Sequence, residues 1–222
     1  SRPGELRSII GPNGAGKTTF LDVITGKVRP TKGDVTLWGK SIVRLSEQKI
    51  SRLGVGRKFQ TPRVWENLTV QRNLELTASP NKNPLALLTE SLNDTVKDEV
   101  FKIMEYVGLA PYAKWQAGSL SHGQKQWLAI SMLVAQSPDI ILLDEPVAGL
   151  TDEETSKTAD LIKSLAGEHT VVVIEHDMEF IRELGAPVTV LHQGQKLTEG
   201  MLEEVKADPR VIEVYLGESD DH

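Results

Sequence analysis

The stretch GPNGAGKTT, residues 11–19, decides the fold class of this chain. It matches G-x-x-x-x-G-K-[ST] in full, with a strand-like apolar run before it and a helical pattern after it. In such a loop the glycines let successive backbone N–H groups face the phosphates of a nucleotide. Lys17 adds a positive charge, and the Thr18 hydroxyl can bind Mg²⁺. The predicted nucleotide-binding residues are Asn13, Gly14, Ala15, Gly16, Lys17, Thr18 and Thr19.

Apolar runs along the chain predict an α/β fold around this loop. Continuous apolar stretches at 139–146 and 170–177 are joined by a helical pattern over 152–167. This is the β-α-β unit of a buried parallel sheet. Further strands are predicted at 5–10, 34–39 and 55–60, and a hairpin at 187–200.

A helical segment interrupts the predicted core, because the apolar pattern is helical from about residue 70 to 136. We therefore predict a P-loop NTPase (RecA-like) core with a mostly parallel sheet and an inserted α-helical subdomain. The core is assigned to residues 1–69 and 137–222, and the subdomain to 70–136. The chain begins with Ser1 shortly before the first strand, so we expect the natural protein to have a further N-terminal segment.

Composition excludes several function classes. The 222 residues are 39% hydrophobic and 25% charged, as is ordinary for a globular protein. The absence of cysteine excludes disulfides and cysteine-based metal sites. A net charge of −6 argues against a nucleic-acid partner, since phosphate contacts need clustered Lys and Arg. No run approaches the roughly 18 apolar residues of a membrane span.

Polar side chains at predicted strand ends complete a nucleotide site. In open α/β sheets the carboxyl edge of the strands faces the ligand. Asp144 is placed there to hold Mg²⁺, and Glu145 can accept a proton from the attacking water. His176 ends another strand and is predicted to contact the γ-phosphate and help hold the water. Gln60 ends a third strand and can ligate Mg²⁺ through its amide oxygen.

The stretch LSHGQ, residues 120–124, predicts a second phosphate site at the start of a largely apolar helix. The first turn of a helix carries free N–H groups and partial positive charge. Ser121 can cap the helix and reach a phosphate oxygen, and Gly123 lets an anion approach closely. The chain has only one phosphate loop, so both sites serve one nucleotide in one chain, or the second serves a neighbour's nucleotide.

A GTPase is excluded because the guanine-reading N-K-x-D is missing. Its nearest counterpart is Asn81-Lys82-Asn83-Pro84, which lacks the aspartate.

The chain resembles the ATP-binding subunit of an ABC transporter in the order and spacing of GPNGAGKTT, Gln60, LSHGQKQ, IILLDEP and His176. The resemblance covers nearly the whole chain. It implies an ATP hydrolase with ATP and Mg²⁺ in which Glu145 and His176 are catalytic, and Thr18, Gln60 and Asp144 hold the metal.

The resemblance also implies that two ATPase subunits pair head to tail, with ATP between the phosphate loop of one and the signature of the other. The signature residues that act in trans are Ser121, His122, Gly123 and Gln124. The implied partners are a second ATPase subunit, identical or related, and transmembrane permease subunits, with a substrate-binding protein involved indirectly. The implied location is the cytoplasmic face of the cell membrane.

The chain departs from the family pattern at three places. His122 replaces a usual glycine, and we expect function to survive because a helical residue needs no glycine. Thr151 stands where an aspartate is usual, which puts a contact across the dimer in doubt, although Asp152 follows. No aromatic residue for stacking on adenine precedes Gly11, which fits a missing N-terminal segment.

Within the family, AGL after DEP, VIEHDM and DPRVIEVYLGE resemble the ATPases of branched-chain amino acid importers. GVGRKFQTP with ENLTV, LSHGQKQW and TDEET resembles the urea-importer branch of that group more closely. We therefore expect urea or short-chain amides as cargo, with branched-chain amino acids as the alternative. The candidate permease contacts are Arg63, Val64 and Trp65.

A soluble ABC ATPase of DNA repair or translation is a further alternative. Such proteins usually carry two cassettes or a long coiled-coil insert, whereas this chain has one cassette and a short insert. A P-loop binding module without turnover is disfavoured because Glu145 and His176 are both present.

Overall fold

The computed structural model describes residues 3–58, 64–79 and 94–217. The chain divides into two compact units. The first consists of Ser1–Arg57, Asp139–Pro146 and Ala159–His222, and the second of Lys58–Pro138 and Val147–Thr158. The sequence-based assignment of a core and an inserted subdomain stays a prediction, and each unit is described here by itself.

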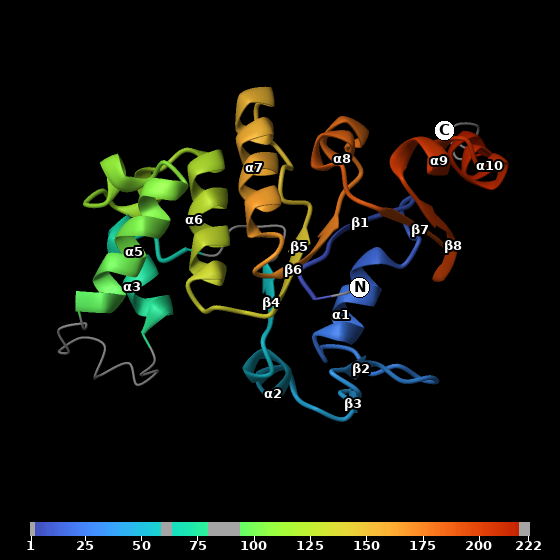
Figure 1. Cartoon of the computed structure of the whole chain (residues 1–222), viewed down its shortest axis with the longest axis horizontal. Helices are drawn as coiled ribbons and strands as arrows, with labels where there is room; N and C mark the ends of the chain where they lie inside the picture. Colours follow the sequence, from blue (N-terminus) through green and yellow to red (C-terminus); the bar gives the residue numbers. More distant parts are fainter. Residues whose placement is uncertain (1–2, 59–63, 80–93, 218–222) are drawn as a thin grey trace. The chain divides into compact units, whose positions relative to one another are not determined.

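A six-stranded sheet forms the centre of the first unit (Figure 1). Strand β1 pairs in parallel with β6 and β7, and β5 pairs in parallel with β6, whereas β8 is antiparallel to β7. This confirms the predicted α/β class with a mostly parallel sheet. The strands, in their order across the sheet, are β4 (Val55–Lys58), β5 (Ile140–Asp144), β6 (Thr170–Ile174), β1 (Leu6–Ile10), β7 (Val188–His192) and β8 (Gln195–Gly200).

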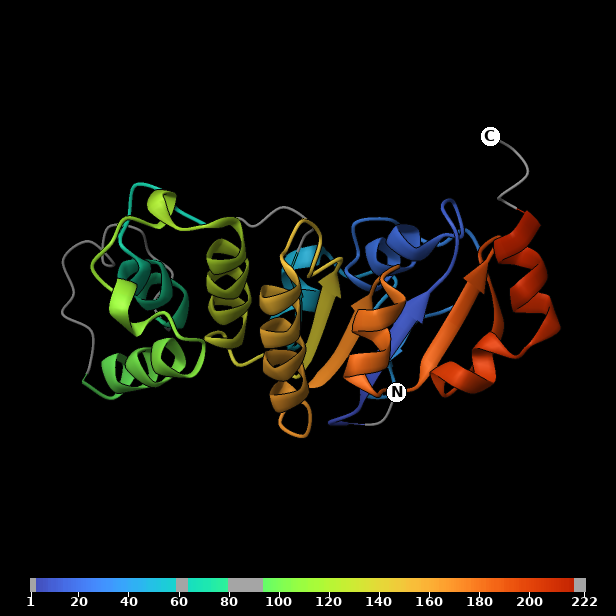
Figure 2. The same cartoon turned by 90° about the horizontal axis from the view of Figure 1, so that it is seen from above.

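Helices cover both faces of this sheet. Helix α1 (Lys17–Ile24) lies on one face and α8 (Met178–Leu184) on the other, as Figures 1 and 2 show from two directions. The central strands β5 and β6 carry almost continuous apolar residues because both faces of the sheet are covered there, and every residue of β6 is buried. The remaining elements of the unit are β2 (Thr36–Leu37), β3 (Lys40–Ser41), α2 (Glu47–Arg52), α9 (Leu202–Lys206) and α10 (Pro209–Gly217).

The second unit is helical and has its own core. Helix α3 (Val70–Ala78) packs against α5 (Asp94–Tyr106) and α6 (His122–Val134). Two short 3₁₀ helices, η1 (Ala110–Tyr112) and η2 (Ala117–Ser119), precede α6. The buried residues of this core are Val70, Leu74, Val100, Met104, Leu109, Ala117, Leu120, Leu128 and Met132.

Helix α7 (Asp152–Leu165) connects β5 to β6, and its residues divide between the two units.

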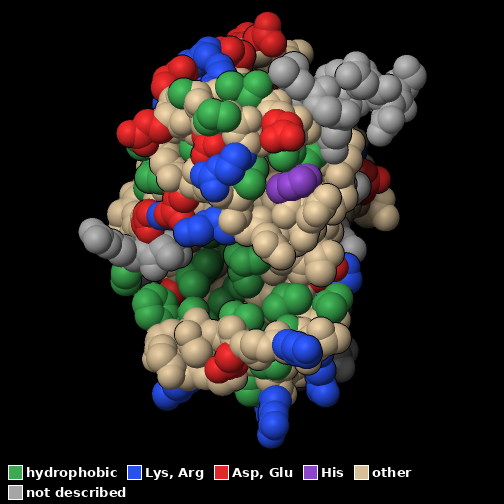
Figure 3. All heavy atoms as spheres, turned by 90° about the vertical axis from the view of Figure 1, so that its right-hand side faces the viewer, with side chains coloured by type: hydrophobic (Ala, Val, Ile, Leu, Met, Phe, Trp, Pro, Cys, Tyr) green, Lys and Arg blue, Asp and Glu red, His purple; other side chains and the backbone are tan. Residues whose placement is uncertain are grey.

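Within residues 3–58, 64–79 and 94–217, no helix is long and apolar enough to cross a membrane. On the upper part of the face in Figure 3, acidic and basic side chains are intermixed. Ion pairs of the first unit include Arg210 with Asp208 and Arg182 with Glu179.

Candidate functional site

The predicted phosphate loop connects β1 to α1 in the first unit. Gly11 is required at its start, because a Cβ atom there would lie 2.2 Å from the Leu191 carbonyl oxygen. Gly16 adopts a left-handed conformation (φ 94°) and is the N-cap of α1. The chain can therefore turn directly from the strand into the helix, whose first N–H groups face the loop.

Lys17 holds its ammonium group within the loop. Its Nζ donates to the carbonyl oxygens of Gly11, at 2.6 Å, and Pro12, at 2.9 Å. Ala15 is buried and anchors the loop, since its carbonyl oxygen accepts from the Gly194 N–H at 2.9 Å. The residues predicted to contact nucleotide are otherwise accessible, for Asn13, Gly14, Thr18 and Thr19 are exposed.

Strand register brings three of the predicted site segments to one edge. Asp144 of β5 lies beside Ile174 of β6, which lies beside Ile9 of β1. The residues that follow these strands therefore emerge together at the carboxyl edge of the sheet. Here Glu145 adopts a left-handed backbone conformation (φ 45°), and its N–H donates to the Ile174 carbonyl oxygen at 2.9 Å. Such a conformation is uncommon outside glycine and is found preferentially at functional sites.

Glu145 and His176 lie close together in this edge. The His176 Nδ1 atom is 3.7 Å from Glu145 Oε1 and 3.6 Å from Glu175 Oε2. The His176 side chain is 67% exposed, whereas that of Glu175 is 1% exposed. The Glu175 carboxylate accepts the backbone N–H of His176 at 3.0 Å, so it fixes the backbone that carries the histidine. Sequence reasoning missed Glu175, although it stands directly before His176 in VVVIEHD.

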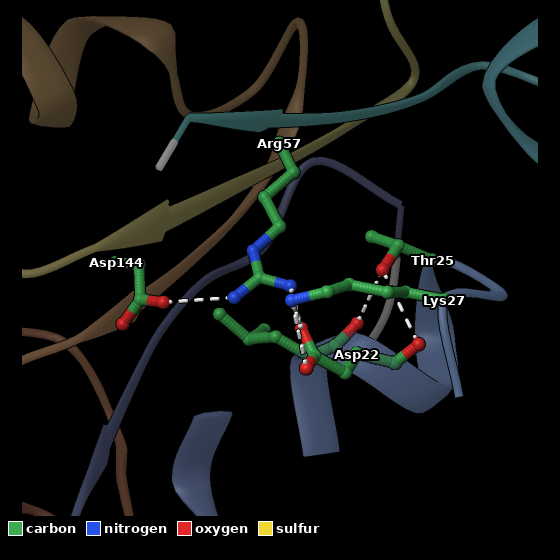
Figure 4. Close-up of polar contacts among 6 residues, drawn as sticks. Asp22, Thr25, Lys27, Arg57 and Asp144 are labelled. Carbon is green, nitrogen blue, oxygen red and sulfur yellow. Dashed lines mark hydrogen bonds and ion pairs between the residues drawn. The ribbon is translucent and has the colours of Figure 1, made fainter. Parts of the chain in front are cut away.

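A buried arginine holds the predicted metal ligand Asp144. The side chain of Arg57, in strand β4, is 4% exposed. Its Nη2 donates to Asp144 Oδ2 at 2.9 Å, and its Nη1 donates to Asp22 Oδ1 of helix α1. Figure 4 shows the guanidinium between the two carboxylates, with the Lys27 ammonium group also reaching Asp22. The arginine thus ties the helix of the phosphate loop to the acidic end of β5.

The same network shifts the pKa of Asp22. Partial burial raises the pKa of this carboxyl, but hydrogen bonds from Arg57 and Lys27, together with their charges, outweigh burial and leave the pKa below its ordinary value. Asp22 is therefore held as an anion at neutral pH. Any stability that it adds is complete above its ordinary pKa and is lost as the pH falls through the lowered one.

Replacing Arg57 by methionine is expected to lower the free energy of unfolding by about 2–3 kcal/mol. The substitution leaves two largely buried carboxylates, Asp22 and Asp144, without the cation that they share. Both carboxylates are slightly exposed, so we expect a smaller loss of stability than the loss on breaking a fully buried ion pair. Urea denaturation at neutral pH measures the loss. Arg52→Met, at an exposed arginine of α2, is the matched control and is expected to change little. Equal stability of the two variants would contradict a bridging role for Arg57.

The residues at this edge fit the small number of protein ligands that a nucleotide-bound magnesium ion would need. Among the described residues, no group of three or more His, Cys, Asp or Glu side chains is arranged to hold a metal. Asp144 presents one carboxylate at the strand end, and Thr18 presents a hydroxyl at the start of α1. Mg²⁺ in nucleotide sites takes one or two protein ligands and completes its shell with phosphate and water. Gln60, the third predicted ligand, lies outside the described residues.

The predicted signature forms the start of helix α6 in the second unit. Ser121 is the N-cap, and its hydroxyl accepts the Gln124 N–H at 3.2 Å, as predicted. Gln124 Oε1 accepts the Ser121 N–H at 2.9 Å, which completes a capping box. The His122 Nε2 atom lies 3.2 Å from the Ala148 carbonyl oxygen, in the loop that follows β5. That contact gives His122 a role within the unit that the sequence did not suggest.

One further carboxylate at the signature was missed by sequence reasoning. Glu154, in the first turn of α7, is oriented towards Ser121, and the Ser121 hydroxyl lies 3.4 Å from Glu154 Oε1. Both residues belong to the second unit.

Comparison with protein families agrees with this geometry. A family model described as "ABC transporter" matches residues 1–148, and one described as "Branched-chain amino acid ATP-binding cassette transporter" matches residues 195–221. The chain is 37% identical to the high-affinity branched-chain amino acid transport ATP-binding protein LivG of Salmonella typhimurium, over 98% of the chain and 89% of that protein. It is 38% identical to the corresponding protein BraF of Pseudomonas aeruginosa, over 97% of the chain and 88% of that protein.

Solved structures show the same fold. The ADP conformation of an ATP-binding cassette of an ABC transporter superposes with a TM-score of 0.82 at 31% identity, and covers 97% of this chain and 89% of that one. A dimeric ATP-binding cassette in a post-hydrolysis state, bound to ADP and phosphate, superposes with a TM-score of 0.74 at 28% identity. That match covers 90% of this chain and 87% of the other.

Proposed function

We propose that this chain, which belongs to the ATP-binding subunits of ABC transporters, hydrolyses ATP to power the import of urea or short-chain amides. The carboxyl edge of the sheet supports the chemical part of the proposal. There the phosphate loop follows β1, Asp144 and Glu145 stand at the end of β5, and His176 lies just after β6, and these three strands are neighbours in one sheet.

Each side chain of this edge has a distinct role in the proposed reaction. The loop N–H groups and Lys17 bind the β- and γ-phosphates, and Asn13, Gly14, Ala15, Gly16 and Thr19 shape and line that loop. Thr18, Gln60 and Asp144 would hold Mg²⁺, which when bound would neutralise phosphate charge. Glu145 accepts the proton of the attacking water, and His176 orients that water and contacts the γ-phosphate. The 3.7 Å separation of Glu145 and His176 supports their joint role.

We assign the signature residues Ser121, His122, Gly123 and Gln124 to the nucleotide of a second subunit. The preformed capping box at α6 supports this assignment, because it fixes the first turn of the helix and does not use the N–H groups of His122 and Gly123. The neighbour bound to ADP and phosphate is itself dimeric. The partner ATPase subunit is identical to this chain or closely related, and ATP holds the pair together.

Ser121→Arg is expected to leave ATP binding by the isolated chain within about twofold and to abolish ATP-dependent dimerisation. The long cationic side chain fills the space that a partner's phosphate needs, while the phosphate loop of the same chain is untouched. Equilibrium nucleotide binding and sedimentation velocity measure the two effects. A mixture of wild-type and variant chains is the decisive sample, since head-to-tail pairing then leaves one of two sites blocked. Closure of both sites in that mixture would contradict action in trans.

Two observations bear on the cargo and point in different directions. The stretches GVGRKFQTP, LSHGQKQW and TDEET support urea or short-chain amides. The names of the relatives LivG and BraF, and the match at residues 195–221, favour branched-chain amino acids as the second candidate. We expect the ATPase not to contact the cargo itself. The transport assay described next therefore decides between urea or short-chain amides and branched-chain amino acids.

Capture of the tagged chain from the membranes of its native host tests the transport proposal. We expect permease subunits and a second ATPase to be recovered, at the cytoplasmic face of the membrane. The recovered complex, reconstituted with its substrate-binding protein, is then assayed for ATP hydrolysis with urea, acetamide or leucine. Stimulation by urea or acetamide supports the proposal, and stimulation by leucine alone supports the second candidate. Recovery of ribosomes or repair proteins without a permease would favour a soluble ABC ATPase instead.

The segment around Trp65 is the proposed permease contact. Trp65 is 49% exposed, and Val64 beside it is partly buried, whereas Arg63 lies outside the described residues. The backbone of Trp65 is fixed by the fully buried Asn73, which accepts the Trp65 N–H at 2.8 Å and donates to its carbonyl oxygen at 3.0 Å. An exposed aromatic on a fixed backbone is a favourable anchor for a partner helix.

A further inference from the structure

We propose that Glu154 competes with the nucleotide for the signature site, so that it sets the ATP concentration at which two subunits pair. The proposal rests on the proposed function, since it assumes that the start of α6 receives a partner's phosphate. All residues that carry it lie in one compact unit, Lys58–Pro138 with Val147–Thr158.

The two carboxylate oxygens of Glu154 have different environments. Oε2 accepts the Thr151 N–H at 3.2 Å and the Thr151 hydroxyl at 3.3 Å. The Thr151 hydroxyl in turn accepts the Glu154 N–H at 3.3 Å, which makes a capping box for α7. This local role explains Oε2 alone. Oε1 is the carboxylate oxygen that contacts the Ser121 hydroxyl of the signature.

Oε1 lies against the start of α6. The Ser121 hydroxyl is 3.4 Å away, and a Cβ atom placed on Gly123 would lie 2.3 Å from Oε1. The missing side chain of Gly123 therefore gives this carboxylate the close approach that was predicted for a phosphate. Ser121 is likewise the residue that was predicted to reach a phosphate oxygen. The carboxylate thus contacts the same two residues as the proposed ligand.

The Glu154 carboxylate can compete with a phosphate for the start of α6 because both are anions. The first turn of a helix stabilises a negative charge, whether it belongs to a side chain or to a phosphate. Two anions cannot share the place without repulsion, so an arriving γ-phosphate must displace the Glu154 carboxylate. Displacement also breaks the α7 capping box, because both oxygens belong to one rigid group. The loop that is released, from Val147 to Thr151, directly follows Pro146 and Glu145.

Glutamine at position 154 separates the two roles. A capping box accepts Glu or Gln at its third helical position, so Glu154→Gln keeps the α7 cap and removes only the charge. The matched control is Glu153→Gln, which makes the same charge change one residue earlier. Glu153 is exposed and pairs with Lys157 of the same helix.

The experiment measures the ATP concentration at half-maximal dimerisation by sedimentation velocity, in chains that also carry Glu145→Gln to prevent turnover. We expect Glu154→Gln to lower that concentration about two- to fivefold, from the typical strength of a charge at a helix start. Glu153→Gln is expected to lower it less than twofold. ATP binding at the phosphate loop of the monomer, measured at protein concentrations too low for pairing, is expected to be the same in all chains.

Equal behaviour of the two variants, or a higher ATP requirement for Glu154→Gln, would overturn the proposal and leave Glu154 as a helix cap. If no chain dimerises at ATP concentrations that saturate the monomer, the proposed trans function itself fails. Circular dichroism checks the fold of each variant. Glu154→Ala gives a second test, because it should lower both the ATP requirement and, through the lost cap, the thermal midpoint.

Discussion

Replacing Glu145 by glutamine is expected to lower the rate of ATP hydrolysis by about a thousandfold, the middle to upper range for removal of a general base. The glutamine side chain keeps the size and hydrogen-bonding reach of the glutamate but cannot accept the proton of the attacking water. The backbone should be unchanged, because its left-handed conformation is held by the hydrogen bond to Ile174. ATP binding is therefore expected to survive, and the ATP-bound dimer is expected to accumulate.

The measurement for Glu145 combines steady-state hydrolysis with nucleotide binding and sedimentation in ATP. Glu179→Gln is the control, since this glutamate is exposed on α8 and pairs with Arg182. It should hydrolyse ATP at the wild-type rate. A Glu145→Gln chain that hydrolyses ATP normally would show that another group accepts the proton.

Replacing Lys17 by alanine is expected to weaken ATP binding by about a hundredfold or more, because truncating one partner of a hydrogen-bonded charge pair costs roughly 2–5 kcal/mol. The ammonium group is the only charge that the loop itself supplies to the phosphates. The same group bonds the Gly11 and Pro12 carbonyl oxygens, so its loss also loosens the start of the loop.

Isothermal calorimetry with ATP measures the effect at Lys17. Lys27→Ala is the matched control, because Lys27 follows the same helix but is exposed and pairs with Asp22. Its ATP affinity should stay within about twofold of wild type, as expected for an exposed pair. Unchanged affinity in Lys17→Ala would contradict the assignment of the phosphate loop.

Much of the fold could be predicted because its strands are buried on both faces. The runs at β5 and β6 are almost continuously apolar, and that pattern is hard to mistake when turn residues bound it. The short helices α2 and α8 were not predicted, since six or seven residues give too little periodicity to separate a helix from a loop. The capping of α6 by Ser121 was predicted because an N-cap is a local feature.

The rest of the site depends on contacts between distant segments. Arg57 lies 35 residues from Asp22 and 87 from Asp144, so no local pattern pairs them. Glu154 was hidden for another reason: its sequence context is that of a helix cap, and nothing local shows that its second oxygen faces Ser121, 33 residues away. The roles of Glu145, His176 and the signature residues stay predictions until the variants are measured.

The capping box of Ser121 and Gln124 also bears on how quickly two subunits can pair. The first turn of α6 is ordered by bonds within the chain, so its conformational entropy is lost on folding and not on encounter with a nucleotide. A surface that is already ordered binds without a slow rearrangement. The rate of pairing is then set by three factors: diffusion, orientation and the departure of the Glu154 carboxylate. Diffusion and orientation limit the association of any two rigid surfaces, so the departure of this carboxylate is the factor particular to this chain.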